Sequence, residues 1–235
     1  MTTNSLESKV VVPGEVIANS SYRPGDRVIK IRDKLYSTVY GVKNIEGRQV
    51  NVIPYREIYR PKKGDTVVGV VVGYGNSGWF VDIGSYTKAF LHVSEAIRGR
   101  FDSRVVELSD HLKIGDIILA KIIDVARLGY FQLTIKGKGL GKITDAYFLK
   151  VDPVKIRRII GRRGSMINLI KEHIKGEIIL GRNGVIVFKG NYESFEKLKM
   201  VIDLIVRKTF ASGLTNRVSE ILSKMVNKND RKNGE

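Results

Sequence analysis

Gly161-Arg162-Arg163-Gly164 lies between two short segments whose isoleucines recur at helical spacing. Because the two glycines carry no Cβ, the backbone can turn tightly there and approach another chain closely. Both residues between them are arginines, whose planar guanidinium groups bind pairs of phosphate oxygens. A helix starting at about Ser165, the expected N-cap, adds the positive end of its dipole. This stretch therefore predicts a loop that grips a phosphate backbone.

The segments around this loop, residues 138–226, predict an α+β domain. Pro153 suits the first turn of a helix, and Asn183-Gly184 suits the turn of a hairpin. The expected order is strand, helix, helix, strand, strand, helix (β-α-α-β-β-α). An amphipathic segment from Leu214 to Val226 adds an extra C-terminal helix, and residues 227–235 are expected to be a disordered tail. The predicted strands are Lys142–Val151, Glu177–Leu180 and Val185–Phe188.

The middle of the chain, residues 61–137, predicts a five-stranded barrel of the OB type. Glycine-containing turns separate five strand candidates, which is the strand number of a small OB barrel. Ser94–Leu112 is long enough to hold a helix and a loop between the third and fourth strands. Alternation along the second strand puts either Trp79 or Phe80 in the core and leaves open which one. The candidates are Thr66–Val72, Trp79–Ile83, Lys88–Val93, Asp116–Val125 and Tyr130–Ile135.

Residues 1–60 predict a small all-β module. Short runs of apolar residues are broken by turn dipeptides such as Pro13-Gly14. Leu35–Val42 and Arg48–Ile53 are rich in β-branched and aromatic residues, and Glu46-Gly47 between them predicts a hairpin turn. The fold class of the whole chain is therefore multidomain β and α+β.

The charge of the chain is high and unevenly distributed. The 235 residues carry a net charge of +17, and residues 137–235 alone hold 21 basic and 10 acidic side chains, an excess of +11. Residues 61–136 hold 10 basic and 8 acidic side chains. So concentrated an excess predicts a polyanionic partner, and a nucleic acid is the usual one. A membrane surface would require a long basic amphipathic helix or a lipidation signal, and neither occurs.

The residue types present exclude several classes of site. The chain has no cysteine, which rules out disulfides, thiolate zinc sites and cysteine nucleophiles. Its three histidines are dispersed and its carboxylates scattered, so we expect no metal, no other cofactor and no catalytic residue. The first residues do not form a leader, and no apolar run reaches the roughly 20 residues of a membrane span. We expect a soluble cytoplasmic protein that is not an enzyme.

Two neighbouring strands of the predicted barrel carry side chains suited to unpaired bases. They contain Gly78-Trp79-Phe80-Val81-Asp82-Ile83-Gly84 and Ala89-Phe90-Leu91-His92-Val93-Ser94. Aromatic rings beside a histidine and basic groups form a stacking platform for single strands. Besides the loop, the residues predict nucleic-acid contacts at Lys88, Lys121 and Arg127 in the barrel, and at Lys155 and Arg158 just before the loop.

These motifs resemble known RNA-binding families. Residues 64–136 resemble the OB-fold module named after the ribosomal protein S-one, through Gly-Trp-Phe-Val-Asp-Ile-Gly and Phe-Leu-His-Val-Ser. The segment around Gly161–Gly164 resembles a type I KH domain. Together with Val11-Val12-Pro13-Gly14-Glu15, the arrangement is similar, over essentially the whole chain, to the KH-containing cap subunit of the archaeal RNA exosome.

The resemblance implies a non-catalytic subunit that binds single-stranded RNA. The N-terminal module would dock onto a hexameric ring of RNase PH-type subunits, with three cap subunits per complex. The cap would guide the 3′ end of the RNA into the pore of the ring for 3′–5′ phosphorolytic degradation or tailing. The other cap type carries a zinc ribbon, which a chain without cysteine cannot form.

The resemblance also assigns roles to particular residues. It implies that Gly161, Arg162, Arg163 and Gly164 form the KH clamp, which holds about four nucleotides. It implies Phe80 and His92 as the RNA-facing pair of the barrel. Ser77 stands where such modules often have a further aromatic residue, which reduces the expected stacking surface.

Three other interpretations make different predictions. A transcription-elongation-type factor also places an OB module before KH domains and acts without a nuclease, but it would have two KH units of the other topology. A purely structural scaffold predicts that RNA binding is dispensable. An intrinsic nuclease predicts that the isolated chain degrades RNA with a divalent metal alone.

Overall fold

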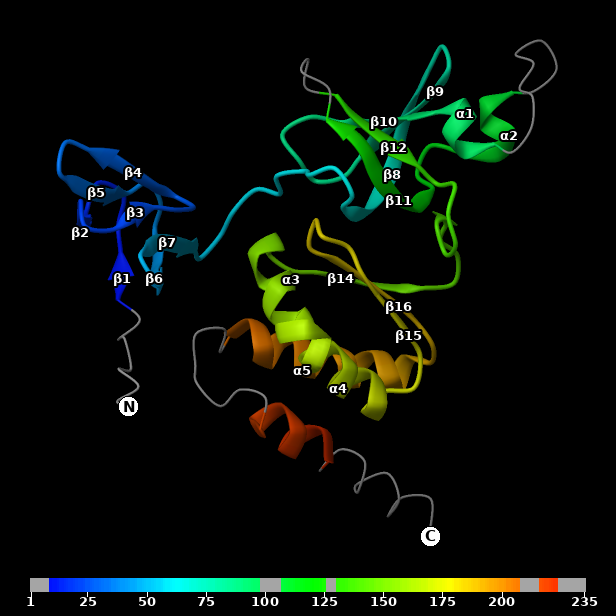
Figure 1. Ribbon diagram of the computed structural model, residues 1–235. Helices are drawn as coiled ribbons and strands as arrows, with labels where there is room; N and C mark the ends of the chain where they lie inside the picture. The colour runs from blue at the N-terminus through cyan, green and yellow to red at the C-terminus, as the bar shows by residue number, and fades with distance from the viewer. Residues whose placement is uncertain (1–8, 98–106, 126–129, 208–215, 224–235) are drawn as a thin grey trace, which may run out of the picture. The chain divides into compact units, whose positions relative to one another are not determined.

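The computed structural model describes residues 9–97, 107–125, 130–207 and 216–223 (Figure 1). The chain divides into an N-terminal unit that ends at Glu57 and a larger unit that begins at Ile58. Among the described residues, no helix is both long and apolar enough to cross a membrane. The predicted disordered tail, residues 227–235, lies outside the described residues.

The N-terminal unit consists of two small sheets, which confirms the predicted all-β module. Their orders are β1-β6-β7-β3 and β2-β5-β4. The predicted turn at Glu46-Gly47 is confirmed, because Glu46 pairs with Gln49 and Gly47 has a φ of +60°. The run predicted over Leu35–Val42 is instead divided between two strands, one ending at Ser37 and the next beginning at Gly41. Leu35 and Val50 lie at the centre of the unit's apolar core. The strands are β1 (Val10–Val11), β2 (Val16–Asn19), β3 (Arg23–Pro24), β4 (Val28–Ile31), β5 (Lys34–Ser37), β6 (Gly41–Glu46) and β7 (Gln49–Pro54).

The larger unit begins with a closed five-stranded barrel, as predicted. Its strands follow the order β12-β10-β9-β8-β11, and β11 pairs with β12 to close it. Trp79 is fully buried and its Nε1 donates to the Leu112 carbonyl at 3.1 Å, so Trp79 rather than Phe80 is the core residue. The elements are β8 (Thr66–Gly75), β9 (Gly78–Asp82), β10 (Ala89–His92), α1 (Val93–Ala96), α2 (Leu108–His111), β11 (Ile117–Val125) and β12 (Phe131–Thr134).

A βααββα segment follows the barrel, in the predicted order. Its three strands form an antiparallel sheet of order β14-β16-β15. Asp152 caps the first helix by accepting from the Val154 amide at 3.1 Å, and Pro153 occupies the first turn. The elements are β14 (Tyr147–Lys150), α3 (Pro153–Ile160), the 3₁₀ turn η1 (Arg162–Gly164), α4 (Ser165–His173), β15 (Glu177–Leu180), β16 (Val185–Lys189) and α5 (Tyr192–Arg207).

The N-terminal end of this segment differs from the prediction, and its C-terminal end agrees with it. The extended run predicted over Lys142–Val151 is divided: Gly141–Lys142 forms β13 on the edge of the barrel, and only Tyr147–Lys150 joins the new sheet. Residues 216–223 are helical, and Val218 and Leu222 are buried in the core of the segment. The described part of the expected C-terminal helix therefore packs back on the domain.

The barrel and the βααββα segment share an apolar contact. Val187 on β16 is fully buried in one cluster with Val68, Leu119 and Ile143 from the barrel and its edge. One face of the sheet therefore contacts the barrel, while Phe188, on the opposite face of the same strand, lies in the core formed with the helices. The contact joins the two parts into one compact unit.

Candidate nucleic-acid interface

The backbone of the Gly161–Gly164 loop depends on both glycines. Gly161 has a φ of +75°, and a Cβ there would lie 2.7 Å from the Met166 amide nitrogen. Arg163 and Gly164 are also left-handed, with φ values of +53° and +82°. Arg162 and Arg163 are exposed. The loop thus presents two guanidinium groups from a tightly turned backbone, as the sequence predicts.

The helix that follows the loop starts differently from the prediction. Ser165 is the first residue of α4, and Gly164 takes the N-cap position without a side-chain capping bond. The expectation that Ser165 is the N-cap is therefore wrong by one residue, because the left-handed Gly164 closes the turn one position earlier. The N-cap of α4 makes no side-chain hydrogen bond to the first turn, and the Ser165 amide donates to the Arg162 carbonyl.

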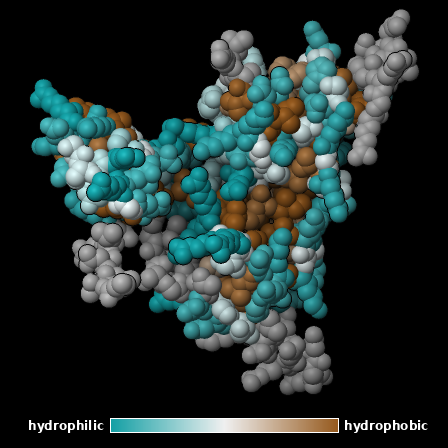
Figure 2. All heavy atoms as spheres, viewed as in Figure 1, coloured by the Kyte–Doolittle hydropathy of each residue, from teal (hydrophilic) through white to brown (hydrophobic). Residues whose placement is uncertain are grey.

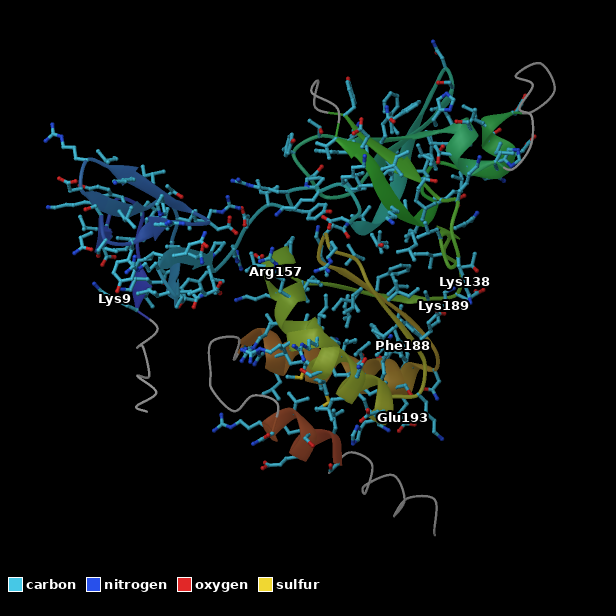
Figure 3. The ribbon with its side chains drawn as sticks, viewed as in Figure 1. Lys9, Lys138, Arg157, Phe188, Lys189 and Glu193 are labelled. Carbon is cyan, nitrogen blue, oxygen red and sulfur yellow. The ribbon has the colours of Figure 1, made fainter. Side chains whose placement is uncertain are left out.

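The basic residues of α3 divide into exposed and buried positions. Arg157, which Figure 3 labels on α3, and Arg158 are both exposed. Lys155 is only 7% exposed, because it lies one turn before the fully buried Ile159 on the inner side of the helix. Burial lowers the pKa of Lys155, and Asp152 opposes that shift. The predicted contact between Lys155 and nucleic acid does not fit this burial, whereas Arg158 is exposed.

On the barrel, the predicted pair Phe80 and His92 belongs to a larger aromatic platform. Phe80 on β9 pairs directly with Phe90 on β10, and their ring centroids lie 5.3 Å apart. The Phe90 and His92 rings are 6.3 Å apart. Both phenylalanines are partly exposed and His92 is exposed. We call Phe80, Phe90 and His92 the aromatic platform, and its partly exposed rings are suited to stacking on bases.

Phe90 belongs to a stretch that the sequence predicts to display aromatic side chains, although it is not among the predicted contacts. It lies two residues before His92 on one strand, so alternation places the two side chains on the same face.

The platform is also flat at one edge, because β8 contributes glycine there. A Cβ on Gly75 would lie 3.0 Å from Cε2 of Phe90 and 3.4 Å from Cε2 of Phe80.

Two short contacts orient the imidazole of His92. Its Nδ1 accepts from the Ser94 amide at 3.1 Å and lies 2.7 Å from the Ser94 hydroxyl. Because Nδ1 accepts, the proton of the neutral ring is assigned to Nε2. The ring therefore presents a donor as well as a face to a base on the platform.

The remaining predicted contacts lie around the barrel. Lys88 is exposed and immediately precedes β10, two residues before Phe90. Lys121 is exposed on β11 between the buried Ala120 and Ile122. Arg127 lies outside the described residues. Among the described residues, no group of three or more acidic or histidine side chains could hold a metal ion.

Two family models match this chain. The model described as "Exosome RNA binding protein RRP4 N-terminal domain" matches residues 8–56, which cover the N-terminal unit. The model described as "RRP4, S1 domain" matches residues 58–124, which cover most of the barrel. The two matches together account for about half of the 235 residues.

Curated proteins named "Exosome complex component Rrp4" match over nearly the whole chain. The protein from Methanothermus fervidus is 38% identical over 220 residues, 94% of this chain and 97% of that protein. The protein from Methanothermobacter thermautotrophicus is 36% identical over 219 residues, 93% of this chain and 69% of that protein. The protein from Pyrococcus horikoshii is 36% identical over 217 residues, 91% of this chain and 82% of that protein.

One solved structure gives a similar result. A crystal structure described as that of a candidate exosome complex RNA-binding protein superposes with a TM-score of 0.67 and 33% sequence identity. The match covers 76% of this chain and all of that chain. The similarity therefore includes the fold as well as the sequence.

Proposed function

The chain belongs to the Rrp4 family of archaeal exosome components, and from this premise we propose that it is a non-catalytic, RNA-binding cap subunit. It captures single-stranded RNA and guides the 3′ end into the pore of an RNase PH-type ring. The ring supplies the chemistry, which is 3′–5′ phosphorolytic degradation or tailing. This family membership favours the exosome over the transcription-elongation-type alternative, because the named relatives match over more than nine-tenths of the chain.

We assign the βααββα segment to the type I KH class. Its element order and its sheet order β14-β16-β15 support that assignment, and so does the glycine-arginine loop between α3 and α4. In KH domains such a loop clamps the backbone of about four nucleotides. The observation that carries the proposal is the pair of exposed arginines, Arg162 and Arg163, on the turn fixed by Gly161 and Gly164.

The barrel supplies a second, weaker grip. Stacking on the aromatic platform is tolerant of base identity, because every base has an aromatic face. Lys88 and Lys121 add positive charge to the barrel, and Arg158 adds charge beside the loop. The RNA contacts in this proposal are therefore Arg162, Arg163 and Arg158 in the KH domain, with the platform and the two lysines in the barrel.

The N-terminal unit is the part that we propose docks onto the ring. Figure 2 shows brown, apolar areas among hydrophilic residues on this unit. Val16 and Ile29 both pair with Tyr36 across the β2-β5-β4 sheet, so they lie in one row, and both are exposed. Exposed apolar rows of this kind mark protein interfaces. Three cap subunits on a hexameric ring are the expected assembly.

The experiment is an RNA-binding titration of the full chain at several salt concentrations. Replacing Arg162 and Arg163 by alanine should weaken binding of an adenine 20-mer and flatten the salt dependence by about 0.7 per lost phosphate contact. Replacing Lys171 and Lys175, exposed cations at the far end of α4, removes the same charge and should change binding less than threefold. Equal effects of the two double substitutions would refute the loop clamp.

A further inference from the structure

The turn between β15 and β16, Gly181-Arg182-Asn183-Gly184, is anchored in the barrel. The Asn183 side chain is 5% exposed. Its Oδ1 accepts from the Val68 amide at 3.2 Å, and its Nδ2 donates to the carbonyls of Val68 and Ile83 at 2.7 and 2.9 Å. The amide thus pairs with β8 as a neighbouring strand would, beyond the point where β9 ends. The turn therefore has a fixed position on the barrel.

This anchorage places Arg182 at a defined point on the barrel surface. Its amide donates to the Thr66 carbonyl at 2.8 Å, and its side chain is exposed. The guanidinium lies close enough to Tyr59 to oppose the rise in pKa that burial and Asp65 cause there. Asp65 itself accepts from the Tyr59 hydroxyl at 2.7 Å and from the Lys62 amide. Among the described residues, no ion pair involves Arg182.

The strand register connects Arg182 to the aromatic platform. Thr66 on β8 pairs with Lys121 on β11, and Lys121 pairs with Thr134 on β12. Thr134 follows Leu133, the partner of Leu91, so it lies beside His92 on β10. Arg182, Lys121 and His92 therefore occupy one row around the barrel. Neighbouring positions in this row are two strands apart, which is about 10 Å.

The Arg182 end of the row lies near the start of α3, the helix that ends at the loop clamp. The Gly184 carbonyl accepts from the Val151 amide at 2.8 Å, so the turn lies beside the residues that start α3. The eight residues of α3 span about 12 Å, carry the exposed Arg157 and Arg158, and end at Gly161. Exposed arginines thus lie in the clamp, on α3 and at Arg182. Arg182 is also the first position of the row on the barrel.

We propose that Arg182 and Lys121 bind the sugar–phosphate backbone of a single RNA strand that runs from the loop clamp to the aromatic platform. The inference rests on the proposed function, since it joins the two grips assigned there. Because the turn is fixed, no backbone ordering is needed when Arg182 binds a phosphate, and Lys121 adds a point charge two strands further on. Because the row lies between the two grips, only an RNA long enough to span them uses it.

The test compares an adenine 20-mer with an adenine 4-mer on the full chain. Arg182→Ala and Lys121→Ala should each raise the Kd for the 20-mer about tenfold and reduce its salt slope by about 0.7. Neither should change the Kd for the 4-mer, which is the length of the clamp alone. Lys142→Ala is the matched control: it removes one charge from β13, which pairs with the start of β11, and there Lys142 forms an ion pair with Asp116 at 2.7 Å.

The outcomes separate this proposal from the one on which it rests. The path is overturned if Arg182→Ala binds the 20-mer like Lys142→Ala, while the double substitution at Arg162 and Arg163 still weakens binding. It is equally overturned if Arg182→Ala weakens the 4-mer and the 20-mer to the same degree. If the unaltered chain binds neither RNA, the proposed function itself fails. Both substituted side chains are exposed, so thermal melting should show unchanged folding of each variant.

Discussion

Replacing Asn183 by alanine should loosen the contact between the barrel and the βααββα segment. The change removes three hydrogen bonds and leaves three backbone groups without them: the amide and carbonyl of Val68 and the carbonyl of Ile83. Val68 and Ile83 are 4% and 1% exposed, so water does not readily replace the lost partner. At about 1 kcal/mol for each unsatisfied group, the low end of the usual range, the loss is about 3 kcal/mol.

Amide hydrogen exchange measures this loss at the site itself. A loss of about 3 kcal/mol corresponds to roughly 100-fold faster exchange of the Val68 amide, since 1.4 kcal/mol is a factor of ten. The Val71 amide, which donates to Asp116 on the other side of β8, is the internal reference and should change much less. Asn168→Ala, at an exposed position in α4, is the matched control and should alter neither rate. Val68 protection within threefold of the unaltered chain would refute the reasoning.

Three further predictions concern the grips and the stability of the barrel. Gly161→Ala should abolish clamping and destabilise the fold by about 1–3 kcal/mol, measured by urea unfolding, because its Cβ would meet the Met166 amide at positive φ. Phe90→Ala should weaken binding of an adenine 20-mer by about 1–3 kcal/mol in titrations, and an unchanged Kd would remove Phe90 from the platform. Burial alone would raise the pKa of Asp116, but bonds from Lys142 and the Lys113 amide make the net shift downward. The stabilisation is therefore present above the unfolded-state pKa and is lost as pH falls through the folded-state pKa, and Asp116→Asn should remove this part of the pH dependence of the urea midpoint.

The elements of the fold follow well from the local pattern of the sequence. Isoleucines at helical spacing on either side of Gly161–Gly164 predict the two helices, and alternation with glycine turns predicts the barrel strands. Alternation alone could not decide whether Trp79 or Phe80 is buried. That choice depends on a contact between residues 33 apart in the sequence, in which the Leu112 carbonyl accepts from the Trp79 indole.

The features of the candidate site that the sequence alone does not reveal have physical reasons of the same kind. Asn183 looks like an ordinary hairpin residue in the sequence, because its partners Val68 and Ile83 lie 115 and 100 residues away. Lys155 looks like part of a basic run, and only the packing of α3 shows that its position faces inward. Phe90 joins the platform through a cross-strand pair with Phe80, and that pair depends on the strand register.

The central claim is that this chain binds RNA on behalf of a ring that degrades it. The most direct test measures degradation of a tailed RNA by an RNase PH-type ring alone, with the chain, and with the chain substituted at Arg162 and Arg163. We predict that the chain co-purifies with the ring, accelerates degradation at low RNA concentration, and loses most of that effect in the substituted form. Failure to associate with the ring, or RNA decay by the isolated chain with divalent metal, would contradict the account.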